Sequence, residues 1–198
     1  MTESDAKADL HRYLQDGRDA MLWKLDGLSE YDVRRPLVPT GTNLLGLVKH
    51  LAGVELGYFG ETFGRPWDGP SPADESDPES DMFATPAESR VLITGLYRQA
   101  WAHSDATIEA LPLDSRVTVA WWPDGHRDPT LSTLLVHMIQ ETARHAGQAD
   151  ILRESIDGAA GVREESSGLR EPAGADGWKR HYDKLETIAR SAGDPPGR

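Results

Sequence analysis

The chain has 198 residues, with 33 Asp and Glu against 21 Lys and Arg, which gives a formal net charge of -12. A chain of this length fits one domain and can bury a sizeable core. Its negative field repels phosphate backbones and anionic lipid surfaces, so we expect neither nucleic acid nor a membrane as a partner. The lack of cysteine excludes disulfides, zinc–thiolate sites and a cysteine nucleophile, so any thiol chemistry must use a thiol from outside the protein.

The N-terminus has no basic start followed by an apolar core, so the sequence shows no secretion signal. No apolar run approaches the ~18 residues that a membrane span requires. We therefore expect a cytoplasmic protein.

The first part of the chain predicts two helices and a long loop. Residues 6–28 place apolar side chains at mostly helical spacing. Thr42 or Asn43 offers an N-cap for a second, strongly apolar helix over residues 44–59. Residues 65–86 contain five prolines and an acidic tract, a composition that disfavours a packed core. They predict a surface loop that is a lid, a partner surface or simply solvated.

The middle of the chain predicts a third helix and an extended segment. Thr85–Glu88 combines an N-cap residue, a proline in the first turn and a glutamate that can reach back, so we expect a helix from there to about Leu111. Residues 116–121 alternate between polar and apolar side chains before turn residues, which favours a short strand or extended segment.

The last part predicts the clearest helix in the sequence. Residues 131–156 follow a cap at Thr130 or Ser132, contain no proline and stop at a glycine. An irregular connection then leads to a weaker helix over residues 178–192. Four principal helices indicate an all-α fold, a four-helix bundle. We expect a single domain over residues 1–198, with its core at about 6–158 and the connection and last helix over 159–198.

The fourth predicted helix points two polar residues toward the core. A helix advances about 100° per residue, so residues four apart share one face. Glu141 and His145 lie within about 20° to 40° of the centre of the apolar stripe, which is marked by Leu134, Met138 and Leu152. An unpaired buried carboxylate is costly, whereas a divalent cation would compensate its charge and bind the imidazole as well. A simple hydrogen bond between the two side chains is the alternative.

The remaining histidines are less clearly placed by their sequence context. His137 lies four residues before Glu141 but at the edge of the apolar stripe, which favours a supporting or structural role. His50 lies on a helix that is apolar on many sides, so the helical wheel leaves both a ligand and an edge histidine open. Three others lie in polar surroundings and are expected to be solvated: His103, His126 and His181.

Two stretches resemble the signature regions of the DinB-like superfamily: residues 43–55, and the run from His137 to Glu154 that reads HMIQETARHAGQADILRE. The likeness covers roughly residues 8–158 and is to the actinobacterial branch catalogued as domain of unknown function 664, near the mycothiol-dependent maleylpyruvate isomerases and the mycothiol S-transferases. It implies an up-down-down-up four-helix bundle and often a homodimer.

The resemblance also implies a metal held by one ligand on the second helix and two on the fourth. Mapped onto this sequence, these ligands are His50, Glu141 and His145. Isomerase-like relatives share the glutamate, whereas many others have histidine there. Many close relatives have a histidine at the position of Gln148, so the role of this residue stays open.

Three ligands of mixed nitrogen and oxygen type leave a position open, as in reactive rather than structural sites. We expect one divalent metal, zinc first, with nickel, iron or manganese as alternatives. Since related proteins use low-molecular-weight thiols, the expected co-substrate is mycothiol, whose thiol pKa the metal would lower. The predicted function is a metal-dependent transferase that joins this thiol to an electrophile in detoxification or stress response.

Candidate contacts for the thiol or its acceptor are Arg144, Arg153 and the Trp121–Trp122 segment. A surface salt bridge or core packing is the structural alternative for each. The alternative functions are a thiol-dependent isomerase, a metal-hydroxide hydrolase and a metal-binding stress protein without turnover.

Overall fold

The structure is a computed structural model, and it describes residues 2–74, 76–163, 166, 174 and 176–193. Six α-helices and three shorter helical turns occupy these residues, and no β-strand occurs among them. The predicted all-α class is therefore confirmed. The chain divides into a compact unit over Met1–Ser167 and a second over Gly168–Arg198. The first contains the predicted core of about residues 6–158, while a single domain over the whole chain stays a prediction.

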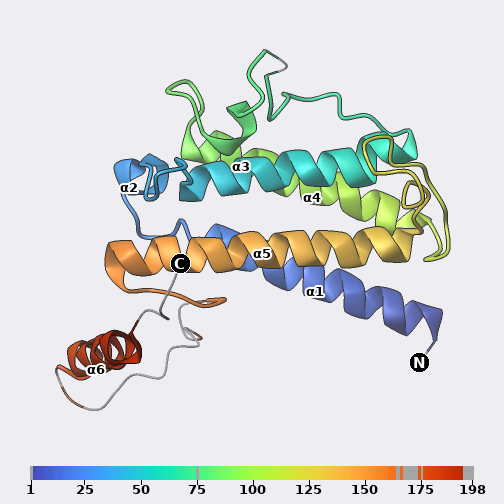
Figure 1. The fold of residues 1–198 in the computed structure, drawn as a ribbon. Helices are drawn as coiled ribbons and strands as arrows, with labels where there is room; N and C mark the ends of the chain where they lie inside the picture. Colours follow the sequence, from blue (N-terminus) through green and yellow to red (C-terminus); the bar gives the residue numbers. More distant parts are fainter. Residues whose placement is uncertain (1, 75, 164–165, 167–173, 175, 194–198) are drawn as a thin grey trace. The chain divides into compact units, whose positions relative to one another are not determined.

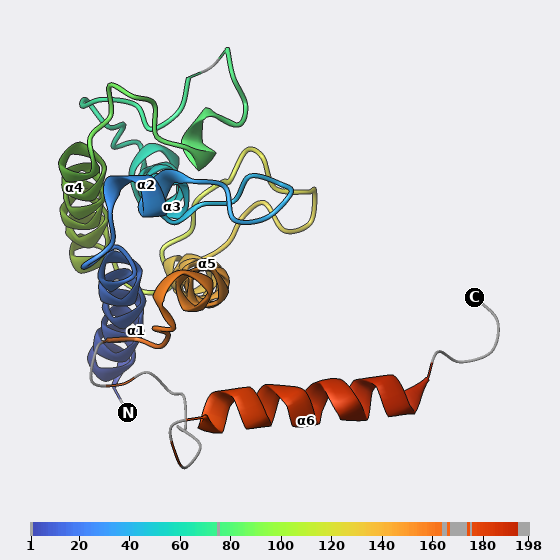
Figure 2. The same ribbon diagram turned by 90° about the vertical axis from the view of Figure 1, so that its left-hand side faces the viewer.

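Four long helices build the first unit: α1 (Glu3–Trp23), α3 (Leu44–Glu55), α4 (Arg90–Ala110) and α5 (Leu131–Asp157). Helix α1 packs on α5, and α3 packs on both α4 and α5 (Figure 1). Figure 2 shows these helices nearly end-on, as a bundle around a common core. A short helix, α2 (Glu30–Arg34), links α1 to α3. Fully buried apolar side chains from all four long helices form the core, among them Leu14, Leu47, Ile93 and Met138.

Two of the predicted helix starts coincide with the observed caps. Asn43 Oδ1 accepts a hydrogen bond from the Gly46 amide at the start of α3, and Thr130 Oγ1 accepts one from the Thr133 amide at the start of α5. Both bonds satisfy amides that have no partner inside the helix. Helix α5 ends at Gly158, whose φ of 79° is the left-handed conformation that glycine adopts without strain.

The predicted start of the third helix at Thr85 is wrong. Glu88 does reach back to the Thr85 amide at 2.7 Å, but α4 begins only at Arg90, with Ser89 as its N-cap. The Arg34 guanidinium donates to the carbonyl oxygens of Ala84, Thr85 and Glu88. The Thr85 carbonyl also accepts the Glu88 amide at 3.1 Å, so this segment forms a single turn ahead of α4.

The second half of the predicted surface loop is tied to α3. Asn43 Nδ2 donates to the carbonyl of Met82 at 3.1 Å, and Lys49 Nζ donates to the carbonyl of Ser80 at 2.7 Å. The loop approaches α3 so closely that a Cβ on Gly46 would lie 1.8 Å from the Met82 carbonyl oxygen. Glycine is thus required at this turn of the helix, and residues 80–82 (the 3-10 turn η3, Ser80–Met82) have a fixed position beside it.

The segment before α5 is extended, as predicted, without forming a strand. Arg116 and Thr130 make an isolated bridge, and the amides of Val117 and Val119 donate to the carbonyls of Pro129 and Arg127. This pairing folds the chain back on itself just ahead of α5. The turn so formed carries Trp121 and Trp122.

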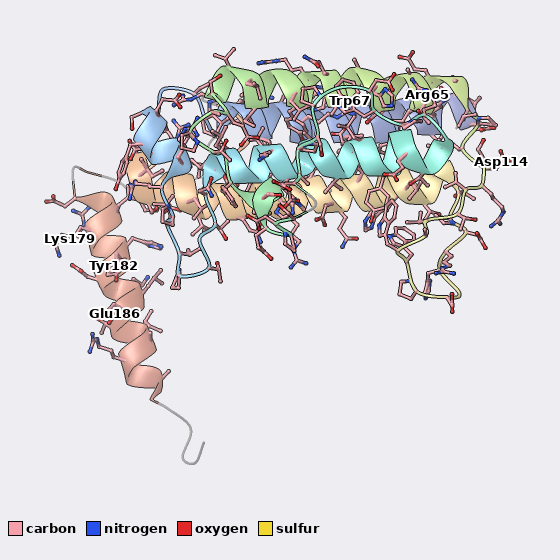
Figure 3. All side chains as sticks on the ribbon, turned by 90° about the horizontal axis from the view of Figure 1, so that it is seen from above. Arg65, Trp67, Asp114, Lys179, Tyr182 and Glu186 are labelled. Carbon is pink, nitrogen blue, oxygen red and sulfur yellow. The ribbon has the colours of Figure 1, made fainter. Side chains whose placement is uncertain are left out.

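The second unit contains α6 (Gly177–Ala192), close to the predicted helix over residues 178–192. Its larger apolar side chains are about half or more exposed and recur at helical spacing: Trp178, Tyr182, Leu185 and Ile188. Charged residues such as Lys179 and Glu186 also lie on this helix (Figure 3). Among the described helices, none combines the length and apolar character needed to cross a membrane.

Candidate metal centre

Three predicted ligands from two helices converge in the structure. His145 Nε2 lies 3.0 Å from Glu141 Oε1, and His50 Nε2 lies 3.8 Å from the same oxygen. One ligand atom from each residue lies within 4.8 Å of the other two. The spacing of four residues brings Glu141 and His145 together on α5, whereas the packing of α3 against α5 adds His50. We call these three residues the triad.

An acceptor holds the outer nitrogen of each triad histidine. Asp81 Oδ2 lies 2.7 Å from His50 Nδ1, and Gln148 Oε1 lies 2.7 Å from His145 Nδ1. A carboxylate or amide oxygen accepts a proton here, which fixes the hydrogen of each ring on Nδ1. Both Nε2 lone pairs then face the Glu141 carboxylate. In this tautomer the inner atoms of the triad are three acceptors that a shared cation can join, whereas a proton on His145 Nε2 would make the simple hydrogen bond to Glu141 Oε1 at 3.0 Å.

This donor set fits a divalent metal ion. Two atoms bonded to a tetrahedral zinc ion at about 2.0–2.2 Å are roughly 3.3 Å apart. The separations of 3.0 Å and 3.8 Å from Glu141 Oε1 to the two histidines lie on either side of that value. Convergent acceptors repel one another unless a cation or a proton lies between them. Imidazoles oriented by outer acceptors are also the usual arrangement around protein-bound metals.

Asp81 reaches His50 because the neighbouring residue anchors the loop. Lys49 is 3% exposed, and its ammonium donates to the carbonyls of Ser80 and Phe83, on either side of Asp81, and pairs with Glu88. Lys49 and His50 therefore hold the same short segment through adjacent side chains. Asp81 was not among the candidate residues in the sequence, where the role of Gln148 stayed open.

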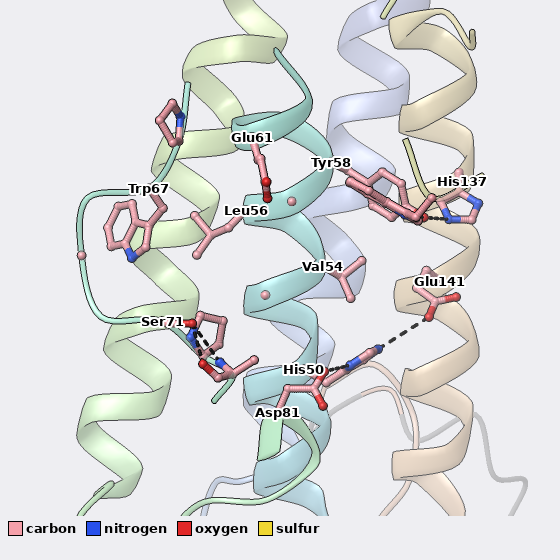
Figure 4. A pocket seen from close by; sticks show the side chains of 17 residues that line it. His50, Val54, Leu56, Tyr58, Glu61, Trp67, Ser71, Asp81, His137 and Glu141 are labelled. Carbon is pink, nitrogen blue, oxygen red and sulfur yellow. Dashed lines mark hydrogen bonds and ion pairs between the residues drawn. The ribbon is translucent and has the colours of Figure 1, made fainter. Parts of the chain in front are cut away.

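A pocket of about 770 Å³ opens beside the triad (Figure 4). It lies along α3 and the π-helical turn η1 (Leu56–Gly60), with the loop that carries Trp67, Ser71 and Asp81 on one side and α5 on the other. Both His50 and Glu141 line it. Glu141 is therefore not enclosed in the core as the helical wheel suggested, because its side chain is 27% exposed at the pocket wall.

An aromatic cluster forms the end of the pocket near the Trp121 turn. The Tyr58 hydroxyl accepts hydrogen bonds from Trp122 Nε1 at 2.9 Å and Trp121 Nε1 at 3.4 Å, and it lies 3.1 Å from His137 Nε2. Tyr58 belongs to the π-helical turn η1, whose wider winding changes the direction of the side chains that follow α3. The sequence indicated Trp121, Trp122 and His137 as candidates but gave no signal for Tyr58.

The other predicted contacts lie elsewhere. Arg144 is exposed and Arg153 is buried, and neither belongs to the pocket lining. Arg153 instead donates to the carbonyls of Trp23 and Lys24 and pairs with Asp157, which completes the end of α1. The expectation of a solvated His103 is wrong, since this half-buried ring donates to the Arg65 carbonyl at 2.7 Å. His126 and His181 are exposed, as expected.

The helical bundle corresponds to the DinB-like class. A sequence profile described as mycothiol-S-transferase matches residues 9–158, which cover most of α1, the other three long helices and all three triad residues. The chain therefore belongs to the mycothiol-S-transferase family. No curated protein matches the sequence.

Proposed function

We propose that this protein is a metal-dependent transferase that joins mycothiol or a close low-molecular-weight thiol to an electrophile, in detoxification or stress response. The observation that carries the proposal is the convergence of three acceptor atoms, with both imidazoles oriented from behind, at the wall of a pocket large enough for small molecules. Membership of the mycothiol-S-transferase family supports a thiol as one substrate.

His50, Glu141 and His145 are the proposed metal ligands. A divalent ion, zinc by preference, would supply an open coordination position and a positive charge that lowers the pKa of a thiol or water bound there. Glu141 contributes one negative charge and the two histidines contribute neutral nitrogen. Asp81 and Gln148 hold the rings so that both Nε2 atoms face that position.

The reaction is a nucleophilic substitution or addition at carbon. The thiol loses its proton to solvent, its sulfur attacks the electrophilic carbon, and a C–S bond forms. In a substitution, the bond to the leaving group breaks and that group departs with the electron pair. In an addition, the π bond of the electrophile breaks and the atom that receives its electron pair takes up a proton from solvent. The cofactor thiol is essential because the chain has no cysteine of its own.

The decisive experiment combines metal analysis with a thiol-transfer assay. Protein loaded with zinc should accelerate the reaction of mycothiol with monochlorobimane, and Glu141→Gln should lose most of this rate. His126→Ala is the matched control, because it removes an exposed histidine that belongs neither to the triad nor to the pocket lining, and it should keep both metal and activity. Stoichiometric metal in the control but not in His50→Ala would identify the site.

Other outcomes would replace the proposal. If metal-loaded protein did not raise the rate of thiol transfer, the chain would be a metal-binding protein without turnover. Release of product without thiol would indicate a hydrolase, and rearrangement of a substrate without net thiol consumption would indicate an isomerase. A protein that holds no metal after reconstitution would contradict the metal site itself. Homodimer formation and a cytoplasmic location stay predictions.

A further inference from the structure

We infer that the acceptor of the proposed transfer is an electrophile that has no negative charge and carries a planar apolar group, and that this group binds against Trp121. We call the part of the pocket formed by Tyr58, Trp121 and His137 the aromatic arm. The inference rests on the proposed function for the reaction, but the binding site stands on the geometry and charge of the pocket.

The charge of the pocket disfavours anions. Glu61, Asp81 and Glu141 line it, and no Lys or Arg occurs among its lining residues in the described part of the chain. Arg65, which is adjacent in sequence to the lining residue Pro66, directs its guanidinium to the His103 carbonyl and the Thr107 hydroxyl. Three carboxylates carry a charge of -3, so a divalent ion at the triad leaves about -1, and a bound thiolate makes the site more negative again. A cleft with a net charge of one sign focuses that field onto its ligands, which disfavours an anionic acceptor.

The aromatic arm offers a fixed apolar surface to a ligand. Trp121 is 54% exposed although its indole N–H is tied to the Tyr58 hydroxyl, and the two rings lie 5.5 Å apart at 51°. Gly57 lies beside one edge of this ring, since a Cβ there would be in van der Waals contact with Trp121 Cη2 at 3.9 Å. A large ring that is held at one edge and open to the pocket suits stacking with a planar group.

The aromatic arm lies next to the triad. His137 precedes Glu141 by four residues on α5, so the two side chains leave the same helix face about 5–6 Å apart at their Cβ atoms. Figure 4 shows His137 and Glu141 one above the other on α5, with Tyr58 facing His137. A ring that stacks on Trp121 can therefore place its reactive carbon near the thiol sulfur at the triad.

Tyr58 is the positioning residue of the aromatic arm. Its oxygen accepts both indole N–H groups, so its own hydrogen is directed to His137 Nε2. Tyr58→Phe would remove all three bonds while keeping the ring. We expect this variant to weaken acceptor binding without changing metal content.

The test compares electrophiles that differ in charge. Metal-loaded protein is assayed with mycothiol and either para-nitrobenzyl bromide or the anionic para-carboxybenzyl bromide, and each rate is divided by the rate of the thiol alone. In this reaction sulfur displaces bromide, which leaves with the electron pair, while the thiol proton passes to buffer. We expect kcat/KM for the neutral compound to exceed that for the anion by at least about tenfold, which is ~1.4 kcal/mol. Glu61→Gln should reduce this ratio.

A binding measurement makes the site testable apart from turnover. The unreactive para-nitrobenzyl alcohol should quench tryptophan fluorescence at lower concentration than para-(hydroxymethyl)benzoate. Trp121→Ala should raise the Kd for para-nitrobenzyl alcohol and the KM for para-nitrobenzyl bromide several-fold, with metal content unchanged. Trp178→Phe is the control, since this exposed tryptophan lies on α6 in the second unit.

The outcomes separate the two proposals. If no electrophile reacted faster with protein, the proposed function would fail, and the binding titration would still decide the site. If the anion reacted or bound as well as the neutral compound while turnover was normal, only the inference about charge would be overturned. Unchanged Kd and KM in Trp121→Ala would overturn the aromatic arm as the acceptor site.

Discussion

Asp81 lies outside the triad but orients one of its histidines, His50. Its carboxylate lies 2.7 Å from His50 Nδ1, where it fixes the ring orientation and the position of the proton. His145 depends in the same way on Gln148, which differs from Asp81 in being neutral and on the same helix. The negative charge of Asp81 also makes the His50 ring a stronger donor to a metal.

We predict that Asp81→Asn lowers the affinity of the protein for zinc by about 10-fold to 100-fold, because the orienting carboxylate is lost. The measurement is a competition titration against a chromogenic chelator. Asp68→Asn removes the same charge from an exposed position of the same loop and should leave the affinity unchanged. Equal affinities in the two variants would show that Asp81 does not support the site.

At the scale of single residues, the sequence alone predicts only some members of the site. The positions of Glu141 and His145 follow from the helical period, and Gln148 could have been found from its distance of three residues to His145. Asp81 lies in a loop whose sequence shows only acidic composition, so its pairing with His50 could not be predicted. Its position depends on contacts that link it to α3 across the fold.

At the scale of the helices and loops, the contacts between α3 and residues 80–88 matter most for the site, because they hold Asp81 beside His50. Lys49 on α3 pairs with Glu88 at 2.8 Å and holds the carbonyls of Ser80 and Phe83. Burial raises the pKa of Glu88, but hydrogen bonds from Lys49 and Thr85 outweigh it and bring the pKa below its usual 4.5. Glu88 therefore prefers the ionised form more strongly in the folded protein than in the unfolded chain.

A carboxylate with a lowered folded pKa stabilises the fold above its unfolded pKa, and this contribution is lost as the pH falls through the folded value. We predict that Glu88→Gln is less stable than the native protein at about pH 7, and that the difference decreases below pH 4.5 and vanishes once the pH is below the lowered pKa of Glu88 in the folded protein. Urea denaturation of both proteins across this pH range measures the difference in their free energies of unfolding. A difference that persisted in acid would show that the pair does not act through its charge.

Among the helices themselves, the sequence predicted best those with strong local signals. Helix α5 has a capping threonine, no proline and a terminal glycine, and its observed bounds of Leu131–Asp157 agree with the predicted 131–156 within one residue. The predicted start of α4 at Thr85 was wrong, since a separate turn precedes the helix and is bound by Arg34, which is distant in sequence. The π-helical turn at Leu56–Gly60 had no local signal.

On the scale of the whole molecule, a metal at the triad would connect two helices that are distant in sequence. His50 lies on α3, and Glu141 and His145 lie on α5, so the ligands are assembled only in the folded bundle. A ligand that binds the folded state but not the unfolded chain stabilises it by mass action. Metal binding and the stability of the first unit should therefore be coupled.

We predict that zinc at 100 times its Kd stabilises the protein by about 2.7 kcal/mol and raises the Tm by roughly 5–10 °C. The measurement is thermal unfolding followed by circular dichroism, with and without chelator. His50→Ala should abolish the shift, whereas His126→Ala should keep it. A shift of the same size in His50→Ala would mean that zinc stabilises the protein from another site.

The sequence by itself determined the helical class, most helix ends and the pair on α5, because these depend on propensities and periods within one segment. It also excluded a cysteine ligand or nucleophile. The family resemblance implied His50 as the third ligand, but only the tertiary structure placed it opposite the pair. The tertiary structure alone also showed that Asp81 orients His50 and that Tyr58 holds Trp121 at a pocket. These relations join segments far apart in the chain, and close packing sets them, as where Gly46 lets the Met82 carbonyl approach α3.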